Sequence, residues 1–125
     1  MTKLNKPVRF ECIIPILNVK SLRDSLRYYR DALGFQVDWG GGEDSLMASV
    51  SRDRISIMLC QESQGKAGMW IWIGVEDIEP LFAEYKKNGV KFRENPTNYP
   101  WAYEMRIEDP DGHILRFGSD PKPDG

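Results

Sequence analysis

The sequence has little cysteine, a single histidine and no long apolar run. Cys12 and Cys60 lie far apart, each in a strand-like apolar segment, which is typical of small buried side chains rather than of a disulfide or a metal motif. We therefore expect a reducing, cytoplasmic location. No segment approaches the roughly 18 apolar residues of a membrane span, and the first ten residues lack the apolar centre of a signal peptide.

An excess of charge of one sign is also missing. The 17 Lys and Arg residues against 19 Asp and Glu residues leave a net charge of −2 at pH 7. This balance excludes the basic patch typical of nucleic-acid binding and the polybasic segment typical of membrane-surface binding, so we expect neither as a partner. A chain of 125 residues is long enough for one domain, residues 1–125, that buries about two thirds of its unfolded surface.

The stretch 101–117 predicts two strands joined by a tight turn. Pro110 suits the first central position of a type I turn, and Gly112 can adopt the left-handed conformation that follows. Such a turn fixes the register, which gathers apolar residues on one side of the hairpin. The facing pairs are Asp109 with His113, Ile107 with Leu115, and Met105 with Phe117.

The same register places Arg106 directly opposite Arg116. Like charges that face each other across a strand pair are unfavourable. Two explanations are open. Either the diagonal neighbours Glu104 and Glu108 neutralise the two arginines, or an anion binds between them.

One pattern, a strand followed by a helix and three more strands, occurs twice along the chain. The strands of the first half are predicted at 10–19, 35–39, 46–50 and 54–60. Those of the second half are predicted at 69–75, at 90–92 and in the two arms of the 101–117 hairpin, with a loop at 95–100. The first helix begins at Ser21 and ends at Gly34, and the second begins after Asp77 and ends at Gly89.

The two halves align at a constant offset of 56 residues, which places Leu22 over Ile78, Leu26 over Phe82 and Tyr29 over Tyr85. Several matches in order indicate two copies of one unit. The predicted fold class is α+β. Two βαβββ modules, at about 9–61 and 69–118, form a cupped mixed sheet with the helices on its outer face.

The inner face of this sheet is predicted to be apolar and ring-rich. In 69–75, Ile71 and Ile73 take the helix side, which leaves Trp70 and Trp72 on the inner face. Met58 takes the inner side of 54–60 by the same alternation. Tryptophans that one chain leaves exposed in a row indicate a surface that another molecule covers. The cover is either a ligand or a second subunit, and both hold if a second chain completes the cavity.

These features resemble the glyoxalase / bleomycin-resistance / extradiol-dioxygenase superfamily, also called vicinal oxygen chelate. The resemblance rests on the paired unit, on NVKSLRDSLRYYRDALGF and on PWAYEMRIEDPDGHILRF, and it covers about residues 9–118. It implies a cupped sheet around a small-molecule pocket. It also implies a homodimer, sometimes with modules exchanged between the chains.

The resemblance also bears on metal binding. Metal-dependent members hold a divalent ion with His, Glu or Gln from four inner strands, and the motifs align these positions with Ile14, Met58, Trp70 and Arg116. Hydrocarbon, thioether and guanidinium groups do not suit a hard divalent ion. The single histidine, His113, points to the helix side in the predicted register. We therefore expect no metal and no cofactor.

The resemblance then favours the metal-free, bleomycin-resistance-like members, which sequester a drug without changing it. We expect a homodimeric binding protein for a flat aromatic ligand, with an anionic one fitting the two arginines, and no catalytic residue. The expected binding residues are Trp39, Met58, Trp70, Trp72, Trp101, Glu104, Arg106 and Arg116.

The alternative is an enzyme of the same fold, a lyase, isomerase or dioxygenase, with an atypical site. Its chemistry would need a base or a nucleophile on the inner face. Glu104 beside two arginines is a weak base, because nearby positive charge keeps the carboxylate ionised. Cys60 lacks a histidine partner that would activate its thiol.

Overall fold

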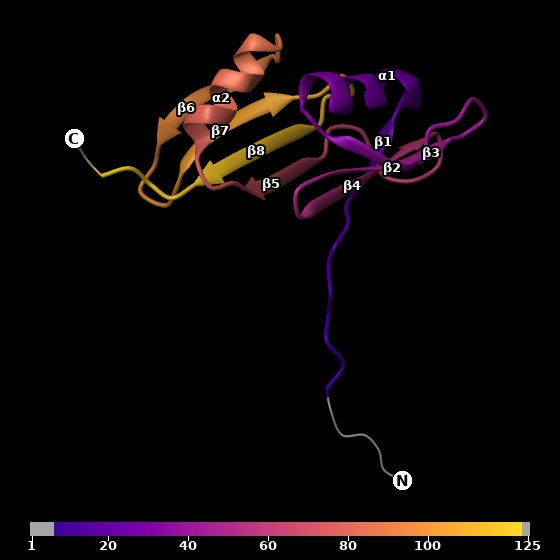
Figure 1. Cartoon of the computed structure of the whole chain (residues 1–125), viewed down its shortest axis with the longest axis horizontal. Coiled ribbons are helices and arrows are strands. Elements are labelled where there is room, and N and C mark those ends of the chain that lie inside the picture. Colours follow the sequence, from indigo (N-terminus) through magenta and orange to yellow (C-terminus); the bar gives the residue numbers. More distant parts are fainter. Residues whose placement is uncertain (1–6, 124–125) are drawn as a thin grey trace.

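The computed structural model describes residues 7–123, which form two four-stranded sheets with a helix on the outer side of each (Figure 1). The strand orders are β1-β4-β3-β2 and β5-β8-β7-β6. In each sheet the first two strands of that order are parallel and the other neighbours are antiparallel. The predicted α+β class and the two βαβββ modules are thus confirmed. Within residues 7–123 no helix has the length and apolar character needed to cross a membrane.

The first module contains one helix and four strands. Its elements are β1 (Ile16–Val19), α1 (Leu22–Arg27), a π-helical turn η1 (Tyr28–Ala32), β2 (Gln36–Gly40), β3 (Met47–Arg52) and β4 (Ile55–Gln61). The Ser21 hydroxyl accepts a hydrogen bond from the Asp24 N–H and caps the helix, as predicted. The helical segment stops at Gly34, whose φ of +78° is a left-handed conformation that suits glycine.

The second module repeats the first. Its elements are β5 (Trp70–Gly74), α2 (Ile78–Lys87), β6 (Phe92–Asn98), β7 (Tyr103–Glu108) and β8 (Ile114–Ser119). The Asp77 carboxylate caps α2 by accepting the Glu79 N–H at 3.1 Å. Gly89 follows the helix with φ +77°. Both predicted helix starts and both glycine stops are therefore confirmed.

Two predicted boundaries are wrong. The first strand begins at Ile16 instead of at residue 10, because residues 7–15 pair with no strand of the described residues beyond the Pro15 carbonyl, which accepts the Met58 N–H at 2.9 Å. The predicted loop at 95–100 is largely strand, since β6 runs to Asn98. Pro96 is tolerated there because β6 is the edge strand of its sheet and its pairing with β7 shifts register on either side of Glu94.

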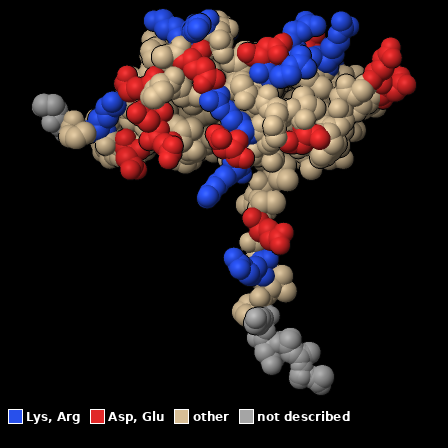
Figure 2. All heavy atoms as spheres, in the orientation of Figure 1, with Lys and Arg blue, Asp and Glu red and all other residues tan. Residues whose placement is uncertain are grey.

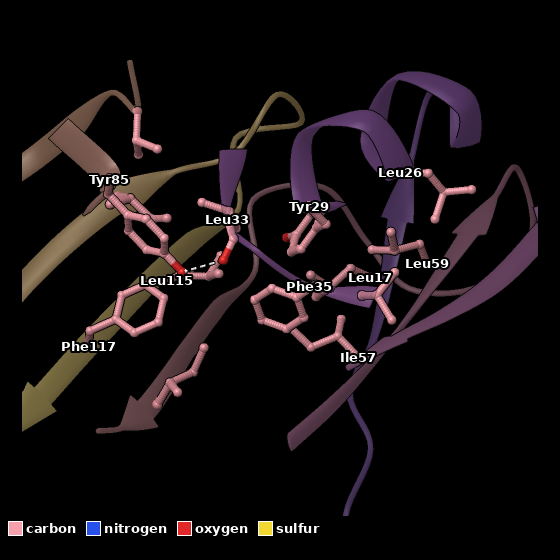
Figure 3. Close-up of a cluster of buried hydrophobic side chains, with 14 of the residues drawn as sticks. Leu17, Leu26, Tyr29, Leu33, Phe35, Ile57, Leu59, Tyr85, Leu115 and Phe117 are labelled. Atoms are coloured by element: carbon pink, nitrogen blue, oxygen red, sulfur yellow. Dashed lines mark hydrogen bonds between the residues drawn. The ribbon is translucent and has the colours of Figure 1, made fainter. Parts of the chain in front are cut away.

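One hydrophobic core joins the two modules beneath the helices. Figure 3 shows Leu33 of the first module close to Tyr85 and Leu115 of the second. The Leu33 carbonyl, at the end of the first helical segment, accepts the Tyr85 hydroxyl at 2.9 Å and the Arg52 guanidinium at 2.8 Å. The Tyr85 hydroxyl of the second module thus satisfies a carbonyl of the first.

The predicted hairpin register is confirmed in full. Met105 pairs with Phe117 and Ile107 with Leu115, and the Asp109 N–H donates to the His113 carbonyl. His113 is fully buried, on the side away from the exposed tryptophans. Its role is structural: Nδ1 accepts the Met69 N–H at 3.0 Å, and Nε2 lies 2.7 Å from the Asn18 carbonyl.

The segment 7–15 leaves the body of the molecule on the side away from the helices (Figure 1). Its large apolar side chains are almost fully exposed: Val8 by 84%, Phe10 by 97% and Ile13 by 93%. Cys12 is exposed as well, which corrects the prediction that both cysteines are buried, whereas Cys60 is buried as predicted. We call residues 7–15 the N-terminal arm. Residues 1–8, whose sequence predicts a polar tail, lie mostly outside the described residues.

Charged residues of both signs cover the face shown in Figure 2. Basic side chains gather over the outer sides of the two helices, and acidic ones lie beside them. This mixture agrees with the near-neutral net charge of the chain. No surface of a single sign marks a partner on this face.

A candidate ligand-binding wall on the second sheet

Sheet register brings the central candidate residues together on the face of the second sheet that is turned away from the helices. Trp72 on β5 lies beside Arg116 on β8, which in turn lies opposite Arg106 on β7. Strand alternation sends Ile71 and Ile73 toward the core, as predicted. We call this face the tryptophan wall, defined by Trp70, Trp72, Glu104, Arg106 and Arg116.

Glu104 is the buried centre of the wall, with 1% of its surface exposed. One of its carboxylate oxygens accepts the Trp72 indole N–H at 3.0 Å, and the other accepts Arg116 Nη2 at 2.7 Å. Burial by itself favours the neutral acid. The hydrogen bonds from Arg116 and Trp72 outweigh that effect and hold the pKa of Glu104 below its usual value. Glu104 is therefore an anchoring carboxylate and a weak base.

Arg106 connects the wall to its rim. Its guanidinium lies over the Trp70 ring, 5.5 Å from the ring centroid, and its Nε is 3.7 Å from a carboxylate oxygen of Glu94. The Tyr99 hydroxyl donates to the other oxygen of Glu94. The Tyr99 ring stacks on Trp101 with centroids 4.7 Å apart and planes 10° from parallel. Contacts thus connect Trp101, at the rim, to Trp70 in the wall through Tyr99, Glu94 and Arg106.

The structure answers the question raised by the two facing arginines. Arg116 is neutralised by Glu104, as the first explanation predicts. Arg106 is paired with Glu94 rather than with Glu108, because the irregular edge strand β6 sets Glu94 opposite Arg106. Glu108 instead pairs with Arg93 at 2.8 Å. The two arginines thus each face a carboxylate, and the wall carries no excess positive charge.

Six of the eight predicted binding residues come together here, with Trp101 at the rim. Trp70, Trp72 and Trp101 expose 57%, 53% and 63% of their surface, so each offers an open ring. The other two lie on the first sheet: Met58 is half-buried in β4, opposite Ser49, and Trp39 is exposed at an irregularity of β2. The sequence assigns all eight to one binding site, with Trp39 and Trp101 next to loops at its rim, whereas the structure divides the eight residues between two sheets.

The tryptophan wall is an open surface in a single chain. The hollow of about 740 Å³ between the β3–β4 turn and the start of α2 lies on the helix side, and a second of about 890 Å³ lies between α1 and the loop after β2. Neither hollow is lined by a tryptophan. Enclosure of the wall therefore requires a ligand or a further chain.

The donor set does not fit a catalytic metal. Of the four aligned positions, Ile14 precedes β1, Met58 lies in β4, Trp70 in β5 and Arg116 in β8. Arg116 is already engaged by Glu104, and none of the four offers an oxygen or imidazole donor. Across residues 7–123, no three His, Cys, Asp or Glu side chains converge into a group that could hold an ion.

Four residues of the site escaped sequence reasoning. Glu94 and Tyr99 fall in a stretch that was predicted to end a strand and form a loop. Gly74 and Gly118 pair across β5 and β8 directly beneath the Trp72 ring. A glycine in the interior of a strand often marks a close approach by another group, and this is the signal that would have found the pair.

Comparison with known proteins supports the fold and the family. Residues 9–117 match the family model described as the Glyoxalase/Bleomycin resistance protein/Dioxygenase superfamily. No curated protein sequence matches the chain.

Three solved structures share the fold at low sequence identity. The antibiotic binding protein TnmS3 from Streptomyces sp. CB03234 is 17% identical, with 90% of this chain and 98% of that chain covered at a TM-score of 0.78. The bleomycin-binding protein from Streptomyces verticillus, solved with copper(II)-bleomycin, is 23% identical, with 90% and 98% covered at 0.77. TioX from Micromonospora sp. ML1 is 13% identical, with 89% and 99% covered at 0.78. Because the family model spans nearly the whole chain, the protein belongs to the glyoxalase/bleomycin resistance protein/dioxygenase superfamily.

Proposed function

We propose that this protein is a metal-free small-molecule binding protein. It holds a flat aromatic ligand, an antibiotic among the candidates, against the tryptophan wall, and a second copy of the chain completes the cavity. The observation that carries this proposal is the wall itself: open indole rings beside an ion-paired carboxylate and two neutralised arginines. Aromatic surface with a few placed polar groups is typical of sites for small organic ligands.

The chemistry of the wall favours binding over catalysis. A general base needs a pKa near the working pH, but the pKa of Glu104 is lowered by its partners. The Ser63 hydroxyl, 3.0 Å from the Cys60 thiol, lowers the pKa of that thiol, but Cys60 lies on β4 of the first sheet, outside the tryptophan wall. The imidazole of His113 is engaged with Met69 and Asn18. The wall thus offers stacking surface and fixed hydrogen bonds, but no activated proton acceptor or nucleophile.

Two of the solved structures support the ligand class. One is described as an antibiotic binding protein and the other as a bleomycin-binding protein in complex with copper(II)-bleomycin. The neutralised arginines bear on ligand charge, because a wall without excess positive charge gives an anion no advantage. We therefore favour a neutral or cationic ring over the anionic one suggested by the sequence.

The N-terminal arm supports the homodimer. Three large apolar side chains that are more than four-fifths exposed are unfavourable in water, and a second copy is a partner always present at equal concentration. Over residues 8–12, Val8, Phe10 and Cys12 alternate with Arg9 and Glu11, which is the pattern of a strand buried on one side only, whereas Ile13 falls on the other side.

Tryptophan emission titrated with bleomycin and with a panel of planar aromatic antibiotics and acids tests the function. We expect saturable quenching by at least one member of the panel and weaker binding in Trp70→Ala and Trp72→Ala. Lys86→Ala, on the outer side of α2, serves as the control with unchanged binding. Quenching that survives both tryptophan substitutions would remove these residues from the site, and absence of saturable binding across the panel would overturn the proposal.

A further inference from the structure

The indole of Trp72 lies flat across two paired glycines. A Cβ atom added to Gly118 would stand 2.6 Å from Cζ2 and 3.1 Å from Cε2 of that ring. A Cβ atom added to Gly74 would stand 3.1 Å from Cζ3. The first distance is shorter than any contact a real Cβ atom makes, so the ring occupies space that only glycine leaves open. One face of the indole is therefore packed against the sheet, and the opposite face is left for solvent.

The edge of the same ring is fixed as well. The indole N–H donates to Glu104, which is buried and held on its other oxygen by Arg116. Rotation about the side-chain bonds would break this hydrogen bond and leave a buried carboxylate oxygen without its donor, which is costly. The backbone of Gly74 and Gly118 beneath the ring and the Glu104 carboxylate at its edge together hold the Trp72 side chain in one position.

We infer that Gly74, Gly118 and Glu104 are positioning residues that fix Trp72 as a one-sided stacking platform for an electron-poor planar ring. This inference rests on the proposed function and names the chemical class of its ligand. An N–H that donates to a carboxylate enriches the indole ring in electron density, because polar groups in contact polarise each other. Such a ring attracts electron-poor or positively charged π systems most strongly.

One tryptophan of the wall already has a planar cation over its ring. The guanidinium of Arg106, a planar cation, lies over the ring of the neighbouring Trp70. The open face of Trp72 has no such partner among the residues described, so a ligand ring is free to take the equivalent place. Because the platform is fixed before binding, ligand association does not have to order this side chain, which is worth about threefold to tenfold in affinity.

Gly118→Ala tests the positioning. Its added methyl group forces the indole off the sheet, and the half-exposed ring has room to swing toward solvent, so we expect the fold to survive. Gly42→Ala is the matched control, since its Cβ meets no atom within 4 Å. The first readout needs no ligand: the indole N–H resonance of Trp72, assigned by its loss in Trp72→Phe. We expect a shifted, faster-exchanging signal in Gly118→Ala and an unchanged one in Gly42→Ala.

The second readout is ligand choice, measured with three probes of similar size: N-methylquinolinium as cation, quinoline as neutral ring and naphthoate as anion. We expect the wild type to bind them in that order of affinity. Glu104→Gln retains the size of the side chain but removes the charge, so it should bring the three affinities to within about threefold of one another. Gly118→Ala should weaken all three probes about threefold to tenfold, while Gly42→Ala leaves them unchanged.

The outcomes separate this inference from the proposed function. If the wild type binds the probes and Gly118→Ala binds them equally well with an unmoved indole signal, the positioning role is wrong and the binding function stands. Tightest binding of naphthoate, or a charge preference unaltered in Glu104→Gln, would overturn the ligand class. If Gly118→Ala moves the indole but no aromatic compound binds the wild type, the positioning role stands and the proposed function fails.

Discussion

His113 connects three segments that are distant in the sequence. Its ring accepts the N–H of Met69, which precedes β5, and hydrogen-bonds the carbonyl of Asn18 in β1. The backbone N–H of His113 donates to the Asp109 carboxylate. The His113 side chain is fully buried, and its hydrogen bonds to Met69 and Asn18 are partly buried. The imidazole thus acts as a joint between the modules, and the chain's single histidine is structural.

Loss of the His113 side chain should lower the stability of the protein. His113→Ala leaves the Met69 N–H and the Asn18 carbonyl without partners and opens a cavity, so we expect a loss of about 2–4 kcal/mol in the free energy of unfolding. Urea titration measures it. Lys66→Ala, in the exposed segment between β4 and β5, should stay within about 0.5 kcal/mol of the wild type. A comparable, small loss in both variants would contradict the role of the ring as a joint.

Glu104 makes the stability of the protein depend on pH in a definite direction. Its pKa in the folded state is lower than the ordinary value of 4.5, so the folded protein holds this proton less tightly than the unfolded chain. The stabilisation is fully present above the ordinary value and is lost as the pH falls through the folded-state pKa. We expect the advantage of the wild type over Glu104→Gln, measured by urea titration, to shrink between neutral pH and about pH 3.

Other carboxylates also titrate in this range, so the comparison uses a second pair of proteins. Glu43→Gln, in the exposed loop after β2, should stay within about 0.5 kcal/mol of the wild type throughout, as is usual for an exposed substitution. If the Glu104→Gln difference were equally flat, or grew on acidification, the carboxylate would not be the anchor of Trp72 and Arg116.

The ends of the helices give a clean test at the scale of an element. Gly89 follows α2 with φ +77°, and a Cβ added there meets no atom within 4 Å. Any cost of Gly89→Ala therefore comes from backbone conformation alone, and we expect about 1–2 kcal/mol less stability by thermal or urea unfolding. Gly42→Ala also meets no atom but lacks the positive φ, so it should be nearly neutral. Equal effects in the two variants would contradict this account.

Local signals in the sequence predicted these elements well where one cause dominates. Ser21 and Asp77, 56 residues apart, both cap helices, and Gly34 and Gly89 both end them. Turn chemistry at Pro110 and Gly112 sufficed for the hairpin register. These predictions succeed because capping and turn preferences act over a few residues and need no knowledge of the rest of the chain.

The strand β6 shows where such reasoning fails. Pro96 argues against a regular strand, and the segment 95–100 was therefore predicted as a loop. Tertiary context overrides the local signal, because β6 is an edge strand and Pro96 falls where its register with β7 shifts, between Glu94 and Thr97. This irregular strand also affects the site, because Glu94, the partner of Arg106, lies in β6 directly before the segment and could not be assigned from spacing.

At the scale of the whole molecule, the sequence repeat predicted two modules, but it did not predict which binding residues lie on which sheet. Alternation correctly turned Trp70 and Trp72 away from the helices. It could not show that Met58 and Trp39 belong to a different sheet, because the relative placement of two sheets depends on packing across the whole core. What covers the inner face was also beyond the sequence, which left ligand and subunit equally open.

Variants of the N-terminal arm can test whether a second subunit covers the inner face. If its apolar side docks on a second copy, light scattering at micromolar concentration should show a dimer for the wild type and a monomer for Phe10→Asp, since a buried charge opposes docking. Arg9→Ala, on the polar side of the arm, should remain a dimer. The exposed thiol of Cys12 provides a second readout: it should react slowly with a thiol reagent in the dimer and rapidly in Phe10→Asp.

The same variants test whether the ligand cavity is shared. A tryptophan wall that is open in one chain needs the second copy for enclosure, so Phe10→Asp should lose ligand-induced quenching together with dimerisation, whereas Arg9→Ala retains both. A monomer that binds with full affinity would show that one chain suffices and that the shared cavity is wrong. A dimer that persists in Phe10→Asp would instead place the subunit contact elsewhere and leave the exposure of Phe10 without this explanation.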